Sequence, residues 1–136
     1  MIFVDASAIV AILNQEPEAA EFIHILESED DKITSPIAVF EAAAAVTRER
    51  RISPTEAAAV VRMLLMEASV MVAPINEQIG AVAVEAFEQF GKGRHPARLN
   101  MGDCFAYAGA KAHGARLLFK GDDFGRTDAV AASAAG

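Results

Sequence analysis

Short apolar runs alternate with longer alanine-rich segments along the chain. The short runs predict a buried strand at 2–4 and further short strands at 32–34, 70–73 and 116–119. The longer segments predict helices at 6–14, 17–27, 35–51, 53–68, 76–90 and 99–114. Strands that alternate with helices form βα units, so the pattern predicts an α/β fold in which helices cover both faces of a parallel sheet.

Several helix starts carry recognisable capping residues. Ser35 suits an N-cap and Pro36 the first helical position, where a missing N–H does no harm. Ser53 suits the N-cap of a second helix that starts in the same way, and Glu56 three residues later fits a capping box. Pro17 suits the first turn of the helix over 17–27.

Size and composition indicate one globular domain. The chain has 136 residues and a mass of 14.4 kDa, which is enough for one core and too little for two. We expect a single domain over 1–130 and a frayed, low-complexity tail over 131–136. Charged residues interrupt the apolar stretches and no signal-peptide pattern begins the chain, so the protein should remain in the cytoplasm. The single cysteine cannot form an internal disulfide.

Charge is unevenly distributed, although the chain as a whole carries −7. Residues 91–120 hold six basic residues and one acidic residue, Asp103. Lys92, Arg94 and Arg98 lie just before that aspartate. A solvated loop of no function would explain these charges, and so would a surface that binds an anionic partner.

The remaining acids of interest follow the predicted strands. Asp5 comes directly after the first strand, and Asp122 and Asp123 follow the fourth. Glu41 lies in the second turn of the helix after the second strand, and Asp103 in the first turn of the helix that leads into the fourth. Ligands collect at the carboxyl edge of open parallel sheets. We therefore expect these acids to converge there.

Each acid also has a plain structural explanation. Asp5 can cap a helix, Asp103 can stabilise a helix dipole, Glu41 can be a solvated helix residue, and Asp122 and Asp123 can form a turn. These explanations leave the convergence of all of them unexplained. Two carboxylates about 4 Å apart repel by roughly 4 kcal/mol at an effective dielectric constant of about 20, so the cluster needs protons or cations. Oxygen ligands favour Mg²⁺, with Mn²⁺ as a substitute.

Other chemistries lack their residues. There is no phosphate-binding loop of the G-x-x-x-x-G-K-[ST] kind and no G-x-G-x-x-G fingerprint. His24, His95 and His113 show no paired-ligand spacing, and Cys104 suits a small core position. A phosphatase of the haloacid dehalogenase type needs a second acid where Ser7 stands.

Four segments, in chain order, carry a resemblance to a known family. They read "IFVDASAIVAIL", "SPIAVFEAA", "LNMGDCFAYAGAKAHG" and "LLFKGDDFGRTD", and "FGKGRHPA" precedes the third. They resemble the signature regions of PIN-domain ribonucleases, in particular the VapC toxins of VapBC toxin–antitoxin pairs. The resemblance implies a PIN-like three-layer α/β/α sandwich with a short parallel sheet of about four or five strands flanked by helices.

The resemblance also assigns roles to the acids. Asp5, Glu41 and Asp103 fall on the family's first three acids, and Asp123 is preferred to Asp122 as the fourth. Mg²⁺ would be held by Asp5 and Asp103, with Glu41 and Asp123 directly or through water. It would activate a water for endonucleolytic cleavage of RNA that leaves a 5′-phosphate.

Further residues receive supporting roles, some from the same resemblance and the basic ones from the positive charge of residues 91–120. Ser7 and Asn100 are candidates for support of the acids, and Asp128 for a structural role. Lys92, Arg94, Arg98 and Lys120 are the expected RNA-binding residues.

Two kinds of partner and two rival functions complete these expectations. A VapB-type antitoxin is expected to lie across 6–14 and 35–67 with a basic side chain at the acids, and a homodimer is expected as a family habit. The main rival is a catalytically silent PIN-like module that binds metal or RNA. A receiver-type phosphotransfer domain is disfavoured because no aspartate follows the third strand.

Overall fold

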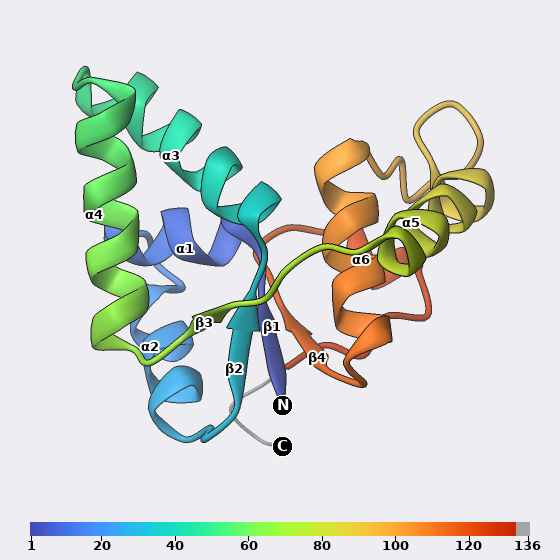
Figure 1. Ribbon diagram of the computed structural model, residues 1–136, viewed down its shortest axis with the longest axis horizontal. Helices are drawn as coiled ribbons and strands as arrows, with labels where there is room; N and C mark the ends of the chain where they lie inside the picture. Colours follow the sequence, from blue (N-terminus) through green and yellow to red (C-terminus); the bar gives the residue numbers. More distant parts are fainter. Residues whose placement is uncertain (133–136) are drawn as a thin grey trace.

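The computed structural model describes residues 1–132. Its sheet has four parallel strands in the order β3–β2–β1–β4 (Figure 1). They are β1 (Ile2–Val4), β2 (Lys32–Thr34), β3 (Met71–Val72) and β4 (Arg116–Leu118). The helices are α1 (Ala6–Leu13), α2 (Ala19–Glu27), α3 (Pro36–Arg50), α4 (Pro54–Glu67), α5 (Glu77–Phe90) and α6 (Met101–Ala112), and a 3₁₀ turn η1 spans Phe124–Arg126. The expected α/β architecture is confirmed.

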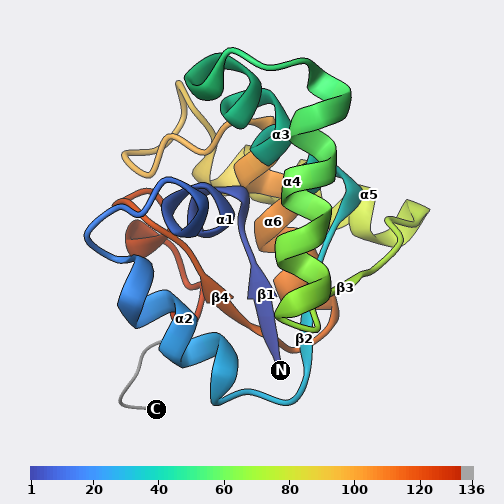
Figure 2. The ribbon, with the colours of Figure 1, turned by 90° about the vertical axis from the view of Figure 1, so that its left-hand side faces the viewer.

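Alternating residues of the central strand divide the core in two. Ile2 and Val4 pack under α1–α4, whereas Phe3 points to the opposite face, among residues of α5 and α6. This follows from the two-residue period of a strand. Figures 1 and 2 show α1–α4 on one side of the sheet and α5 and α6 on the other, so the sheet is the middle layer of a three-layer sandwich.

Most element boundaries agree with the expectation from sequence, with small differences that have local causes. The third strand is two residues long, because the Val70 N–H bonds to the Leu65 carbonyl as α4 ends. Helix α2 begins at Ala19, since Pro17 and Glu18 lie in the preceding turn.

The N-caps at Ser35 and Ser53 are confirmed. Ser35 Oγ accepts the Ala38 N–H and Ser53 Oγ accepts the Glu56 N–H. The Glu56 carboxylate accepts the Ser53 hydroxyl at 3.2 Å instead of the Ser53 backbone N–H, so only the Ser53 half of the expected capping box is formed. Both helices therefore start where their capping residues predict.

The end of the described chain lies along β4. The Leu117 N–H donates to the Val130 carbonyl at 2.7 Å and the Ala132 N–H donates to the Leu117 carbonyl at 2.9 Å. Of the tail expected over 131–136, residues 131 and 132 are thus paired with β4, and 133–136 lie outside the described residues. Within residues 1–132, no helix combines the length and apolar character that a membrane crossing requires.

Candidate active site

The connections between strands create a crevice at the carboxyl edge of the sheet. The chain passes from β1 to β2 to β3 through α1–α4 on one face, then returns through α5 and α6 on the other face to add β4 beside β1. The strand order therefore reverses between β1 and β4, and ligands bind at such a switch point in α/β sheets. Asp5 directly follows β1 at this point, and Asp123 lies beyond β4.

Asp5 is both a helix cap and a buried acid of the crevice. Its side chain is 5% exposed. Its Oδ2 accepts the Ser7 backbone N–H at 3.0 Å and the Ser7 hydroxyl at 2.5 Å. Burial raises the pKa of Asp5, the Ser7 hydrogen bonds oppose that rise, and the negative charge of Asp123 adds to it. The capping role of Asp5 is therefore confirmed, and its carboxylate still lies at the crevice.

Glu41 is not a solvated helix residue. Its carboxylate lies against Gly102 in the first turn of α6. Glu41, on α3, therefore contacts the helix that carries Asp103. Burial, with the negative charges of Asp5 and Asp103, raises the pKa of Glu41 to about 7. A carboxyl with that pKa has lost much of its contact with water.

Asp103 belongs to a capping box that the sequence interpretation missed. Asn100 Oδ1 accepts the Asp103 N–H at 2.8 Å, and Asp103 Oδ2 accepts the Asn100 N–H at 3.1 Å. The N-x-x-D spacing was the available signal. Burial raises the pKa of Asp103 to about 6, with Asp5 and Asp123 adding to the rise and the Asn100 hydrogen bond opposing it. Asn100 thus fixes the first turn that presents Asp103.

Asp123, rather than Asp122, interacts with the other acids. Its charge raises the pKa of both Asp5 and Asp103. The Asp122 carbonyl accepts the Gly125 N–H and closes the turn around η1. This arrangement favours Asp123 as the fourth acid and leaves Asp122 the turn-forming role.

Ser7 joins the two strands on either side of the switch point. While its hydroxyl donates to Asp5, Ser7 Oγ accepts the Lys120 backbone N–H at 2.9 Å. Asp128 lies elsewhere: its carboxylate accepts the Tyr107 hydroxyl and ties the end of the described chain to α6. Ser7 therefore orients Asp5 directly, whereas Asp128 contributes to the fold.

The four candidate RNA-binding cations differ in their surroundings. Lys120 forms ion pairs with Glu16 and Glu18, so its charge is already engaged. Lys92, Arg94 and Arg98 are exposed in the loop before α6, and the Arg94 guanidinium lies 5.7 Å from the centre of the Phe87 ring. The available positive charge is therefore in the loop rather than beside β4.

The donor chemistry of the crevice fits a hard divalent cation. The donors there are carboxylate oxygens, and burial, followed by the negative charges of the neighbouring acids, raises the pKa values of Asp5, Glu41 and Asp103. Among residues 1–132, no group of three or more Asp, Glu, His or Cys side chains is placed so that it could hold a metal ion without rearrangement. Cys104 is buried and burial raises its thiol pKa, in keeping with a small core residue.

The charge on Glu41 should make the metal-free protein less stable at alkaline pH. Because its folded-state pKa of about 7 lies above the unfolded value of 4.5, this contribution to stability is complete at acid pH and is lost as the pH rises through about 7. Glu41→Gln should therefore match the wild type in denaturant unfolding at pH 4, below the unfolded value, and exceed it at pH 8. A difference between the two proteins that does not change with pH would contradict the raised pKa.

Comparison with known proteins agrees with this geometry. The PIN domain family matches residues 2–130. The chain is 43% identical to a VapC ribonuclease of Rhizobium meliloti, over 94% of this chain and 99% of that protein. It is 37% identical to ribonuclease VapC30 of Mycobacterium tuberculosis, over 92% of this chain and 93% of that protein.

Solved structures share the fold. The crystal structure of VapC20 of M. tuberculosis, described as a toxin that cleaves the sarcin–ricin loop, superposes with a TM-score of 0.74 at 18% identity, over 98% of this chain and 99% of that one. VapBC-1 of nontypeable Haemophilus influenzae gives a TM-score of 0.69 at 19% identity, over 100% of both chains. Family match, sequence identity and fold thus agree, and the chain belongs to the PIN domain family, among its VapC members.

Proposed function

We propose that this protein is a Mg²⁺-dependent endoribonuclease that acts as the toxin of a toxin–antitoxin pair. The observation that carries the proposal is the convergence of Asp5, Glu41, Asp103 and Asp123 from four separate segments on the switch point of the sheet. The names of its relatives, VapC ribonucleases, support the same activity.

Each acid has a role in this proposal. Asp5 and Asp103 hold Mg²⁺, with Glu41 and Asp123 as further ligands directly or through water. Mg²⁺ bound there would lower the pKa of a water molecule and neutralise charge on the phosphodiester. Ser7 and Asn100 keep Asp5 and Asp103 oriented through the hydrogen bonds described above. Cleavage products with 5′-phosphates are expected.

The loop before α6 is the proposed contact for the RNA backbone. Lys92, Arg94 and Arg98 are exposed there, next to the helix that presents Asp103. Phosphate contacts of this kind position a nucleic acid and make its binding salt-dependent. They offset the repulsion between an acidic crevice and an anionic substrate.

Cleavage of RNA by the purified protein tests the activity. The protein, freed of any partner, is incubated with total RNA in Mg²⁺ and, as a control, in EDTA. Fragments that form only with Mg²⁺ support the proposal, and sequencing of their ends identifies the substrate. Binding of Mg²⁺ without cleavage of any RNA would instead favour the silent binding module.

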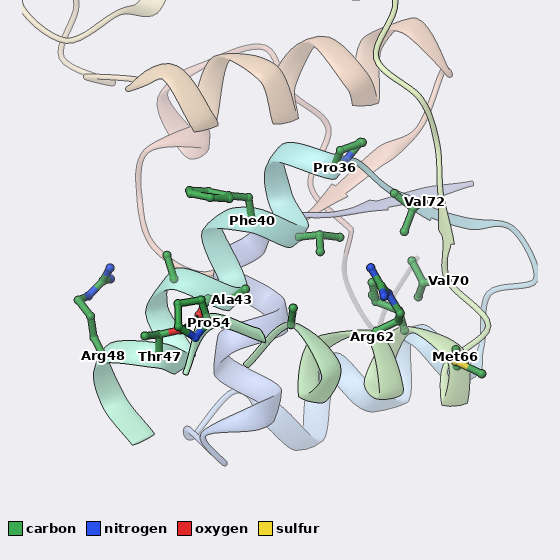
Figure 3. A pocket seen from close by; sticks show the side chains of 14 residues that line it. Pro36, Phe40, Ala43, Thr47, Arg48, Pro54, Arg62, Met66, Val70 and Val72 are labelled. Atoms are coloured by element: carbon green, nitrogen blue, oxygen red, sulfur yellow. Dashed lines mark hydrogen bonds between the residues drawn. The ribbon is translucent and has the colours of Figure 1, made fainter. Parts of the chain in front are cut away.

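An apolar groove between α3 and α4 is the proposed seat of the antitoxin. The cavity has a volume of about 990 Å³ and is lined mainly by apolar side chains, among them Val39, Ala43, Ala58, Leu65 and Val72. Figure 3 shows Phe40 and Arg48 on α3 and Arg62 and Met66 on α4, along the walls. Such a groove suits the apolar face of a helix, and the two arginines suit acidic residues at its flanks.

The position of Phe40 links this groove to the acids, because Glu41 is the next residue of α3. A chain seated in the groove can therefore continue to the crevice and place a basic side chain there. A solved toxin–antitoxin complex from Klebsiella pneumoniae with the same fold, at a TM-score of 0.70, supports a partner of this kind.

A bulky charge in the groove should release the antitoxin without loss of activity. Ala58→Arg should weaken binding to the co-expressed antitoxin at least about tenfold, a cost of about 1.4 kcal/mol, and leave Mg²⁺-dependent cleavage intact. Ala81→Arg, on the exposed face of α5, is the matched control. Calorimetric titration of the two partners measures the affinity, and equal affinity for both variants would contradict this docking site.

A further inference from the structure

The first turn of α6 has a glycine at the point where Glu41 arrives. Gly102 is buried, and a β-carbon added to it would overlap the carboxyl carbon and both carboxylate oxygens of Glu41. The neighbouring residue on α6 is Asp103, whose charge reaches Glu41. The Glu41 carboxylate therefore occupies the space that a side chain at position 102 would fill.

Backbone conformation does not explain this glycine. Gly102 lies within a helix and is not among the glycines with positive φ, which are Gly93, Gly114 and Gly121. A glycine in a helix costs up to about 1 kcal/mol relative to alanine. The benefit at Gly102 is therefore space, and Glu41 occupies that space.

Other glycines in helices show that this arrangement is specific. A β-carbon on Gly80, in α5, would meet nothing within 4 Å. One on Gly109, in α6, would press on the Phe3 ring in the core. Gly102 is thus in contact with a candidate catalytic acid, and Gly109 makes room for a core side chain. Gly80 has no side chain or backbone close enough to require a glycine.

We infer that Gly102 is a positioning residue, which seats the Glu41 carboxylate against the start of α6 so that Glu41 and Asp103 serve the same Mg²⁺ ion. The inference rests on the proposed function and adds a residue to its site. The partial positive charge at the start of a helix favours a carboxylate in this seat. Gly102 itself touches no reacting atom and acts only through Glu41.

A double-mutant cycle tests the inference, with Mg²⁺ affinity measured by calorimetry as the main readout. Gly102→Ala should weaken Mg²⁺ binding about 10- to 100-fold, as loss of a group that orients a metal ligand does. The fold should survive, because the Glu41 side chain can swing away and alanine favours the helix. In the Glu41→Ala background, Gly102→Ala should cause no further loss.

Two more variants sharpen the test. Gly80→Ala, an equivalent change in α5, should leave Mg²⁺ affinity unchanged. Adding Glu41→Asp to Gly102→Ala shortens the acid by one methylene and should restore part of the lost affinity. Wild-type affinity in Gly102→Ala, the same loss in both Glu41 backgrounds, or an unfolded Gly102→Ala protein would each overturn the inference.

Cleavage of RNA separates this inference from the proposed function. If Gly102→Ala loses Mg²⁺ affinity as expected while the wild type cuts no RNA, the proposed function fails and the positioning role stands. If the wild type cuts RNA and Gly102→Ala binds Mg²⁺ and cuts equally well, only the positioning role fails.

Discussion

Replacement of Asp5 with asparagine should slow RNA cleavage at least about 10³-fold, which corresponds to about 4 kcal/mol of lost transition-state stabilisation. Asparagine keeps the shape and can accept the Ser7 N–H as an N-cap, so the fold remains. The charge that would hold Mg²⁺ is lost. Asp103→Asn should behave in the same way, because the amide oxygen can still accept the Asn100 N–H.

Single-turnover cleavage assays in Mg²⁺ measure this loss. Asp30→Asn, in the exposed loop before β2 and therefore at the opposite edge of the sheet, is the matched control and should cleave like the wild type. Since burial raises the pKa of Asp5, the metal-free Asp5→Asn protein should be no less stable at pH 7 than the wild type. Cleavage at near wild-type rate by either site variant would remove that acid from the catalytic set.

Truncation of Phe3 should have the largest effect on stability. Its side chain is 0% exposed in the central strand and packs among residues of α5 and α6, with its ring against Gly109. Phe3→Ala should lower the free energy of unfolding by about 3–5 kcal/mol, since it removes a buried ring and leaves a cavity.

Unfolding in urea measures this change. Phe40→Ala is the matched control: that ring is 74% exposed, so the same substitution should change stability by less than about 0.5 kcal/mol. A loss below about 1 kcal/mol for Phe3→Ala would mean that the face under α5 and α6 repacks around the missing ring.

The sequence predicts those parts of the fold that local chemistry decides. Ser35 and Pro36 mark a helix start in any context, and the short apolar run 2–4 can hardly be other than a buried strand. The position of Asp5 directly after that strand was sufficient to place it at the carboxyl edge. Element type, strand direction and the edge that carries the acids therefore follow from short-range pattern.

Contacts between distant segments could not be predicted in the same way. The seat of Glu41 on Gly102 joins positions that are far apart in the chain, and nothing near either residue signals it. The ion pairs of Lys120 with Glu16 and Glu18 depend on β4 lying beside β1. The sequence alone therefore leaves Lys120 as a candidate for RNA binding, because its ion pairs form only once the elements are packed together.

The pairing of the first strand with the last has a consequence for protein synthesis. β4 is the last strand of the described chain, and the segment that follows it contains Lys120, whose N–H donates to Ser7, and Asp123. A nascent chain that stops before residue 116 lacks both. The ribosome makes about 5–20 residues per second, and earlier parts of a chain begin to fold first. Helices α3 and α4, which line the proposed antitoxin groove, thus emerge before the crevice is complete, and a partner that binds them early would meet a chain without a finished candidate site.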